Sequence, residues 1–184
     1  QRKKSIKSAE RAMDLYEIPQ LKADAARMIA VTYKELERFE NAIDFYKQAN
    51  TIQPNDYYTL KPLLELELAQ SNEKYKERTK EFFLLDPSNP TIYQDLMRVY
   101  WSYEKIDELL KFFTSKHKSY ASNKKVNGNL HFFSATIHFD KKNYSESKVN
   151  FEKSRELLKD VHKSDHKVFE VIKDYIKEAN KKSR

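Results

Sequence analysis

The stretch FENAIDFYKQANTIQPND, from Phe39 to Asp56, decides the fold. It places Ala42 and Tyr46 four residues apart and Ala49 three residues further on, so small and aromatic side chains share one face of a helix. Pro54 then follows, and a proline cannot continue a helix. A single copy of this pattern predicts an ordinary amphipathic helix, whereas recurrence at a fixed period predicts a repeat array.

The pattern recurs along the chain. Pro54 and Pro87, which each follow a helical stretch, are 33 residues apart. One copy is good, one is fair, and the remaining two are weak because apolar positions are replaced or shifted. In chain order the four copies are Ala26, Ile29, Ala30, Tyr33, Ala42, Tyr46 and Pro54; Leu60, Leu63, Leu64, Phe82, Phe83, Leu85 and Pro87; Tyr93, Leu96, Met97, Tyr100, Leu109 and Phe113; His131, Ser134, Ala135, His138, Ser147 and Phe151.

This spacing resembles the 34-residue tetratricopeptide repeat (TPR), with Ala26 where tryptophan is usual and Ala30 where glycine is usual. The resemblance implies an all-α fold, a right-handed superhelical solenoid of antiparallel helix pairs, with about four units over residues 23–158. An unrelated helical bundle with similar spacing is the alternative. Small residues such as Ala30 and Ala135 would let partner helices approach, and aromatic residues would fill the space between successive pairs.

The flanking segments complete a single TPR-like domain over residues 1–184. Residues 1–22 are expected to hold a helix at Ser5–Glu17, read either as packing under the first repeat or as the end of a preceding repeat. Residues 159–184 are expected to form a C-terminal capping helix with many lysines outward. The stretch from Ser119 to Asn129 breaks the period and predicts a long, mobile connection.

Composition excludes several kinds of site. The 184 residues include one glycine, Gly128, which rules out glycine-rich phosphate loops and dinucleotide fingerprints. The absence of cysteine rules out disulfides, thiolate zinc sites and cysteine nucleophiles. No apolar run approaches the roughly 20 residues that span a bilayer. Because the chain begins at Gln1, we expect it to be a processed or trimmed piece of a longer protein.

The net charge of +7 is unevenly distributed. The surplus lies in residues 1–22, 116–142 and 159–184, whereas residues 23–115 carry a net charge of −4. A nucleic-acid-binding protein more often carries a basic stripe through its body. A nucleic-acid-associated helical repeat that uses its basic ends is therefore the alternative function rather than the first.

The sequence carries no convincing catalytic or metal-binding motif. His162 and His166 share a helical face beside Asp165, but no third ligand is evident, so neither a metal nor another cofactor is predicted. His131 and His138 fall on core positions of the repeat and are expected to be packed. Acid pairs such as Glu65 and Glu67 lack a pocket signature, and no serine sits in a nucleophile elbow. We predict that the protein is not an enzyme.

The family resemblance implies a binding surface, because the first helix of each TPR pair lines a concave face that binds peptides. The implied function is a non-enzymatic scaffold for a partner protein with acidic and bulky apolar residues. For Trp101 and Phe132, the alternative to partner binding is packing against a neighbouring repeat. By position, the groove residues are Arg27, Val31, Lys34, Tyr58, Lys61, Glu65, Gln94, Arg98, Trp101, Phe132, Thr136 and Phe139.

One TPR subclass binds the C-terminal carboxylate of heat-shock chaperones through a clamp of lysine, asparagine and arginine. Val31 stands where that clamp needs asparagine, and Asp95 stands where it needs a cation. The sequence therefore does not predict chaperone-tail recognition.

Overall fold

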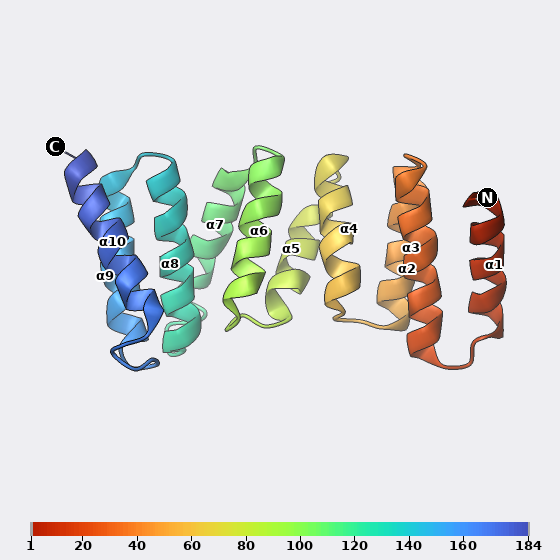
Figure 1. Ribbon diagram of the computed structural model, residues 1–184, viewed down its shortest axis with the longest axis horizontal. Helices are drawn as coiled ribbons and strands as arrows, with labels where there is room; N and C mark the ends of the chain where they lie inside the picture. Colours follow the sequence, from red (N-terminus) through yellow and green to blue (C-terminus); the bar gives the residue numbers. More distant parts are fainter. Residues whose placement is uncertain (1, 184) are drawn as a thin grey trace. The chain divides into compact units, whose positions relative to one another are not determined.

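The computed structural model describes residues 2–183, which form ten α-helices and no strand (Figure 1). The predicted all-α class is confirmed. The helices are α1 (Arg2–Leu15), α2 (Pro19–Glu35), α3 (Phe39–Ile52), α4 (Tyr57–Ala69), α5 (Tyr75–Leu84), α6 (Pro90–Ser102), α7 (Ile106–Lys116), α8 (Lys124–Asp140), α9 (Tyr144–Leu158) and α10 (Lys167–Lys182).

The chain divides into two compact units, one ending at Asp86 and the other beginning at Pro87. In the first unit, each of the helices α1 to α4 packs on the next one along the chain, ending with α5. In the second unit, α6 to α10 do the same, and α6 also contacts α8. Each unit therefore has the consecutive helix packing of a helical repeat.

The cores are built from the repeat positions. In the first unit, Ala30 on α2 is completely buried against Ala42 and Tyr46 of α3 and Leu63 of α4. In the second unit, Ala135 on α8 lies in a cluster with Phe151, Leu158 and Ile172. Alanine at these positions allows neighbouring helix backbones to approach closely, as the sequence pattern predicts.

The turn inside each helix pair has the same backbone geometry four times. Glu37, Ser71, Glu104 and Lys142 each have a φ between 52° and 63°. In every case the next residue donates its N–H to a carbonyl five residues back, at 2.8–2.9 Å. These are Schellman motifs, which usually place glycine at the left-handed residue. Because this chain uses Glu, Ser and Lys instead, its sequence does not reveal these turns.

The long connection predicted from Ser119 to Asn129 is wrong. Helix α7 ends at Lys116 and α8 already begins at Lys124. The side chain of Asn123 caps α8 by accepting a hydrogen bond from the N–H of Val126 at 3.1 Å. Gly128 thus lies inside a helix rather than in a loop. The helices predicted at the two ends of the chain are present as α1 and α10.

Candidate functional site

The repeated turns show that the predicted groove residues occupy equivalent places in successive helix pairs. Each set lies at a fixed distance before the left-handed residue of its turn. The residues six positions before it are Val31, Glu65, Arg98 and Thr136, and those ten positions before it are Arg27, Lys61, Gln94 and Phe132. The predicted residues therefore belong to one face of α2, α4, α6 and α8.

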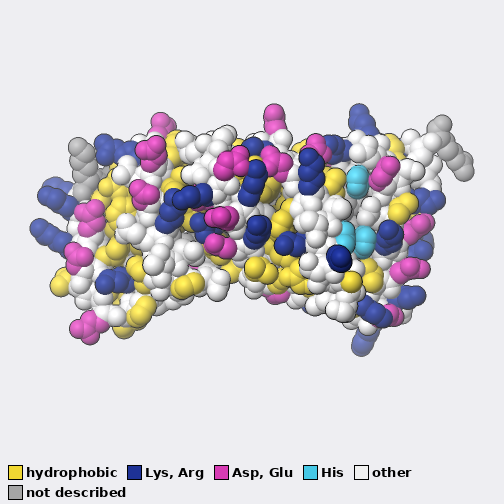
Figure 2. All heavy atoms as spheres, turned by 180° about the vertical axis from the view of Figure 1, so that it is seen from behind, with side chains coloured by type: hydrophobic (Ala, Val, Ile, Leu, Met, Phe, Trp, Pro, Cys, Tyr) yellow, Lys and Arg dark blue, Asp and Glu magenta, His cyan; other side chains and the backbone are white. Residues whose placement is uncertain are grey.

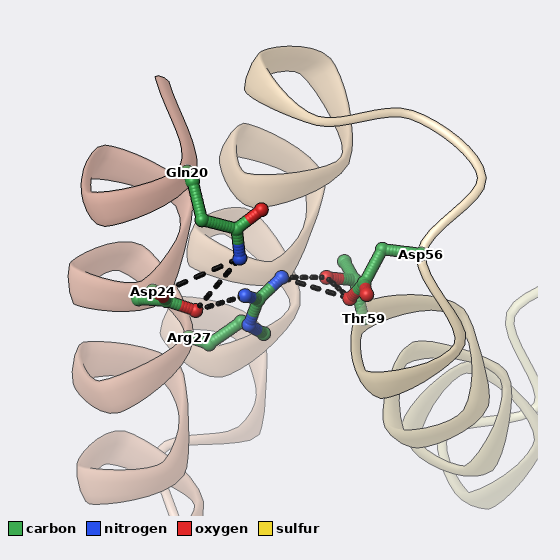
Figure 3. A network of polar contacts seen from close by, with 5 residues as sticks. All are labelled: Gln20, Asp24, Arg27, Asp56 and Thr59. Atoms are coloured by element: carbon green, nitrogen blue, oxygen red, sulfur yellow. Dashed lines mark hydrogen bonds and ion pairs between the residues drawn. The ribbon is translucent and has the colours of Figure 1, made fainter. Parts of the chain in front are cut away.

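Arg27 of α2 is held by residues of its own chain (Figure 3). Its guanidinium donates to the Asp56 carboxylate at 2.8 Å and to the Thr59 hydroxyl at 3.0 Å, and it also forms an ion pair with Asp24. The Arg27 side chain is only 13% exposed. Asp56 directly precedes α4, so Arg27 ties the first repeat to the start of the second rather than presenting a free cation.

The other predicted residues of the first unit remain accessible. Tyr58 is 74% exposed and Val31 is 44% exposed. Lys34 of α2 lies 3.8 Å from the Glu65 carboxylate of α4, and both side chains reach solvent. The Lys61 ammonium lies 5.8 Å from the centroid of the Tyr57 ring. The exposed face of α2 and α4 thus combines apolar side chains with a solvent-accessible ion pair.

In the second unit, α6 carries an exposed cation beside an exposed aromatic ring. The Arg98 side chain is 70% exposed, with its guanidinium 3.4 Å from the carboxylate of the buried Asp95. Trp101, three residues later on the same face, is 39% exposed, and Gln94 is also exposed. Arg98 can therefore bind a carboxylate of another molecule while Trp101 contacts its apolar groups.

The three residues predicted on α8 have different surroundings. Phe132 packs edge-to-face against the buried Phe151, with ring centroids 5.5 Å apart, and thus belongs to the core. The Thr136 hydroxyl donates to the Phe132 carbonyl at 3.1 Å. Phe139 lies between the rings of Tyr144 and Tyr175. For Phe132, the structure thus shows a packing role, through α9 of its own helix pair.

Histidine side chains, drawn in cyan, gather in the right half of Figure 2, where dark-blue Lys or Arg side chains are also seen. The rings of His117 and His131 stack with centroids 3.9 Å apart. Burial lowers the pKa of His131 to about 4, although a hydrogen bond with the Asn150 side chain opposes that shift. Burial also lowers the pKa of His138. Both imidazoles are therefore neutral at physiological pH, as expected of packed side chains.

Sequence reasoning missed a buried ion pair in the degenerate second repeat. Glu67 of α4 is fully buried, and its carboxylate lies 3.5 Å from the Arg78 guanidinium of α5. Burial raises the pKa of Glu67, while Arg78 opposes that shift. Glu67 occupies the position that Tyr33 and Tyr100 hold in the neighbouring repeats, four residues before the left-handed turn residue. The sequence feature that could have revealed this ion pair is a glutamate where the repeat pattern predicts an aromatic residue.

Comparison with known proteins identifies the repeat. Residues 23–56 match the family model described as "Tetratricopeptide repeat". They comprise most of α2, its Schellman turn, and α3. This part of the chain is a tetratricopeptide repeat. The quoted stretch Phe39–Asp56 is the second half of that TPR.

A search of solved structures found a chain described as "MamA MSR-1 C2". It is 14% identical, and the match covers 88% of this chain and 96% of that chain at a TM-score of 0.42. A comparison with curated proteins found no match.

The chain offers no geometry for a bound metal among its described residues. No three or more histidine, aspartate or glutamate side chains between residues 2 and 183 gather closely enough to hold an ion. Across the same residues, no helix combines the length and apolar character needed to cross a membrane.

Proposed function

We propose that this TPR protein is a non-enzymatic scaffold that binds another protein through the exposed faces of the first helices of its repeats. The observation that carries the proposal is the pair Arg98 and Trp101 on α6, one turn apart and both accessible. Arginine holds carboxylates with two parallel hydrogen bonds, and tryptophan is a frequent anchor at protein interfaces. The partner segment is thus expected to carry a carboxylate next to a bulky apolar group.

The corresponding surface in the first unit is formed by Val31, Lys34, Tyr58, Lys61 and Glu65. Lys34 and Glu65 are separated by 3.8 Å and are partly solvated, so a partner's charged group can replace either contact at little cost. The largely buried Arg27 side chain supports this surface through its contacts with Asp56 and Thr59. We therefore assign Arg27 a positioning role in this proposal.

Affinity capture with the intact chain, compared with a double variant, tests the proposal. The variant Trp101→Ala, Arg98→Glu should weaken binding of the captured partner by about 2 kcal/mol or more, roughly 30-fold, with a nearly unchanged melting temperature. A matched control changes the exposed α7 and α9 residues by Lys111→Glu and Val149→Ala. Full-strength capture by a folded double variant would contradict the role of α6. A loss of stability of about 3 kcal/mol or more would instead make Trp101 a core residue.

A further inference from the structure

Three aromatic rings from three helices meet in the second unit, where α8, α9 and α10 lie side by side (Figure 1). The ring of Phe139 on α8 lies 5.4 Å from that of Tyr144 on α9 and 5.0 Å from that of Tyr175 on α10. The interplanar angles are 71° and 81°, so both contacts are edge-to-face. One face of the Tyr175 ring is covered by Phe151, on which it stacks with centroids 4.8 Å apart.

The chain's own Lys182 is seated against these rings. Its ammonium lies 5.1 Å from the centroid of Phe139 and 5.8 Å from that of Tyr144, within the range of cation–π attraction. The Glu178 carboxylate lies 3.5 Å from the same ammonium. The side chains of Lys182 and Glu178 are 43% and 44% exposed. Solvent-accessible contacts of this kind are weak and can be exchanged for equivalent ones.

Beside these rings lies a cavity of about 330 Å³, lined by Phe139, Val171, Asp174, Tyr175 and Glu178. Two of its five lining residues carry a carboxylate and none carries a cation. A third carboxylate, Asp140, is close enough to Tyr175 to add to the effect of burial in raising the tyrosine's pKa. Among residues 2–183, neither Asp140 nor Asp174 forms an ion pair. The cavity therefore has largely apolar walls and carries, beside the Glu178–Lys182 ion pair, the unpaired carboxylate of Asp174.

We propose that this aromatic–acidic pocket binds a lysine or arginine side chain of a partner protein. The pocket consists of the cavity residues Phe139, Val171, Asp174, Tyr175 and Glu178 and of the neighbouring Tyr144 ring. Lys182 occupies the cation position of the pocket in the free chain, and the partner's side chain replaces it. Ring faces attract the cation, the carboxylates of Asp174 and Glu178 neutralise it, and Val171 contacts an apolar neighbour in the partner. This inference rests on the proposed function, since it adds a basic element to the partner bound by the second unit.

Replacement of Lys182 has a measurable consequence. A ligand that can enter only when Lys182 has left binds with an affinity reduced by the fraction of time that the pocket is open. Removing the Lys182 ammonium should therefore strengthen binding of an external cation. The same change should not alter the affinity of a ligand that binds elsewhere on the chain.

The probe is an acetylated and amidated pentapeptide with a central lysine between two leucines. Its control carries norleucine, which keeps the alkyl chain and lacks the charge. Binding to the 184-residue chain is followed through the ring resonances of the aromatic residues by nuclear magnetic resonance. Lys182→Ala should bind the lysine peptide about threefold tighter or more than the unchanged chain, and Lys181→Ala, which alters an exposed neighbour, should not. Asp174→Asn with Glu178→Gln should remove the preference for lysine over norleucine.

Several outcomes would overturn the inference. These are equal affinity for the lysine and norleucine peptides, no effect of Lys182→Ala, and no ring shift at about 10 mM peptide. Binding of the chain's own copies, seen as dilution-dependent sedimentation that Lys182→Ala abolishes, would also overturn it. Failure here is distinguishable from failure of the proposed function. The α6 double variant reports partner capture through residues that lie outside this pocket.

Discussion

His131 on α8 shows how packing fixes a protonation state. Its ring stacks on His117, at the end of α7, and its Nδ1 lies 2.8 Å from the Asn150 side-chain oxygen on α9. Burial is the main cause of its lowered pKa, and the charges of His117 and Lys153 act in the same direction. Protonating this half-buried imidazole therefore costs part of its hydration and places a cation near the charge of Lys153.

Stability should consequently depend on pH through His131. The folded pKa of about 4 lies below the unfolded value of 6.5, so the unfolded chain takes up the proton first. The contribution is fully present above pH 6.5 and is lost as the pH falls toward 4. Urea unfolding at pH 7.5 and 5.0 should show a larger loss for the unchanged chain than for His131→Gln. Equal losses would contradict this assignment.

Arg27 marks the limit of sequence reasoning for single residues. Its position on the exposed side of α2 could be predicted from the repeat period. Its hydrogen bonds could not, because Asp56 lies 29 residues away and reaches Arg27 only after α3 has returned the chain. The exposed Tyr58 and Arg98 lack comparable long-range contacts, and the helical period was a sufficient guide to their exposure.

At the scale of elements, the α8–α9 pair combines small residues with buried hydroxyl groups. The Ser147 hydroxyl donates to the Ala135 carbonyl and the Ser154 hydroxyl donates to the Gly128 carbonyl, both at 2.9 Å. Both serines are completely buried. Each hydroxyl group thus donates its hydrogen bond to a backbone carbonyl of the facing helix. This is possible only because the two helices approach each other closely.

Gly128 is required by this approach. A Cβ atom there would lie 2.6 Å from Leu158 Cδ2 and 2.7 Å from its Cγ. Gly128→Ala gains about 1 kcal/mol of helix propensity but overpacks a buried contact, so we expect a net destabilisation of about 1 kcal/mol. In the Leu158→Ala background the contact is absent, and the same substitution should stabilise by about 1 kcal/mol. Urea unfolding of the unchanged chain, the two single variants and the double variant gives a double-mutant cycle. An identical effect of Gly128→Ala in both backgrounds would refute the prediction.

The sequence predicted the helices better than it predicted the connections between them. Apolar residues at helical spacing indicated the helices on both sides of residues 117–123. The residues from Ser119 to Asn129 are rich in serine, asparagine and lysine, which is also typical of a loop. Gly128 favoured the same interpretation, because its helical role depends on Leu158, 30 residues later. Contacts between α8 and α9 therefore determine where α8 begins, and local composition does not reveal them.

At the scale of the whole chain, each compact unit is stabilised by packing between neighbouring helices. Tyr33 of α2 stacks on Phe45 of α3, with ring centroids 5.6 Å apart, and contacts the core of the first unit. Tyr33→Ala should destabilise this unit by about 2–3 kcal/mol, somewhat less than a fully buried aromatic residue because Tyr33 is half-buried.

Hydrogen exchange locates this loss. Amide exchange should accelerate in α2 to α4 and remain unchanged in α8 to α10, because repeats contact mainly their neighbours. Val149→Ala, an exposed change on α9, serves as the control and should alter neither region. Equal acceleration in both units would show that the chain unfolds as one cooperative whole.

The all-α class and the helix pairs followed from the sequence because both depend on local periodicity. The second repeat was harder to predict. Its aromatic position holds Glu67, which is stable there only because Arg78 of the next helix pairs with it. The Lys182 contacts were likewise invisible, since they join residues of three helices. The identity of a partner depends on a second molecule and was outside the reach of the sequence.

The four left-handed turns bear on the order in which the chain folds. Each turn closes through hydrogen bonds between residues three and five positions apart, so a helix pair can form as soon as its own residues are available. Proteins dominated by such local contacts fold rapidly, and during synthesis the N-terminal segments form first. Each newly completed pair then offers its apolar side to the next one. We therefore expect growth from the ribosome one helix hairpin at a time, without waiting for the C-terminus.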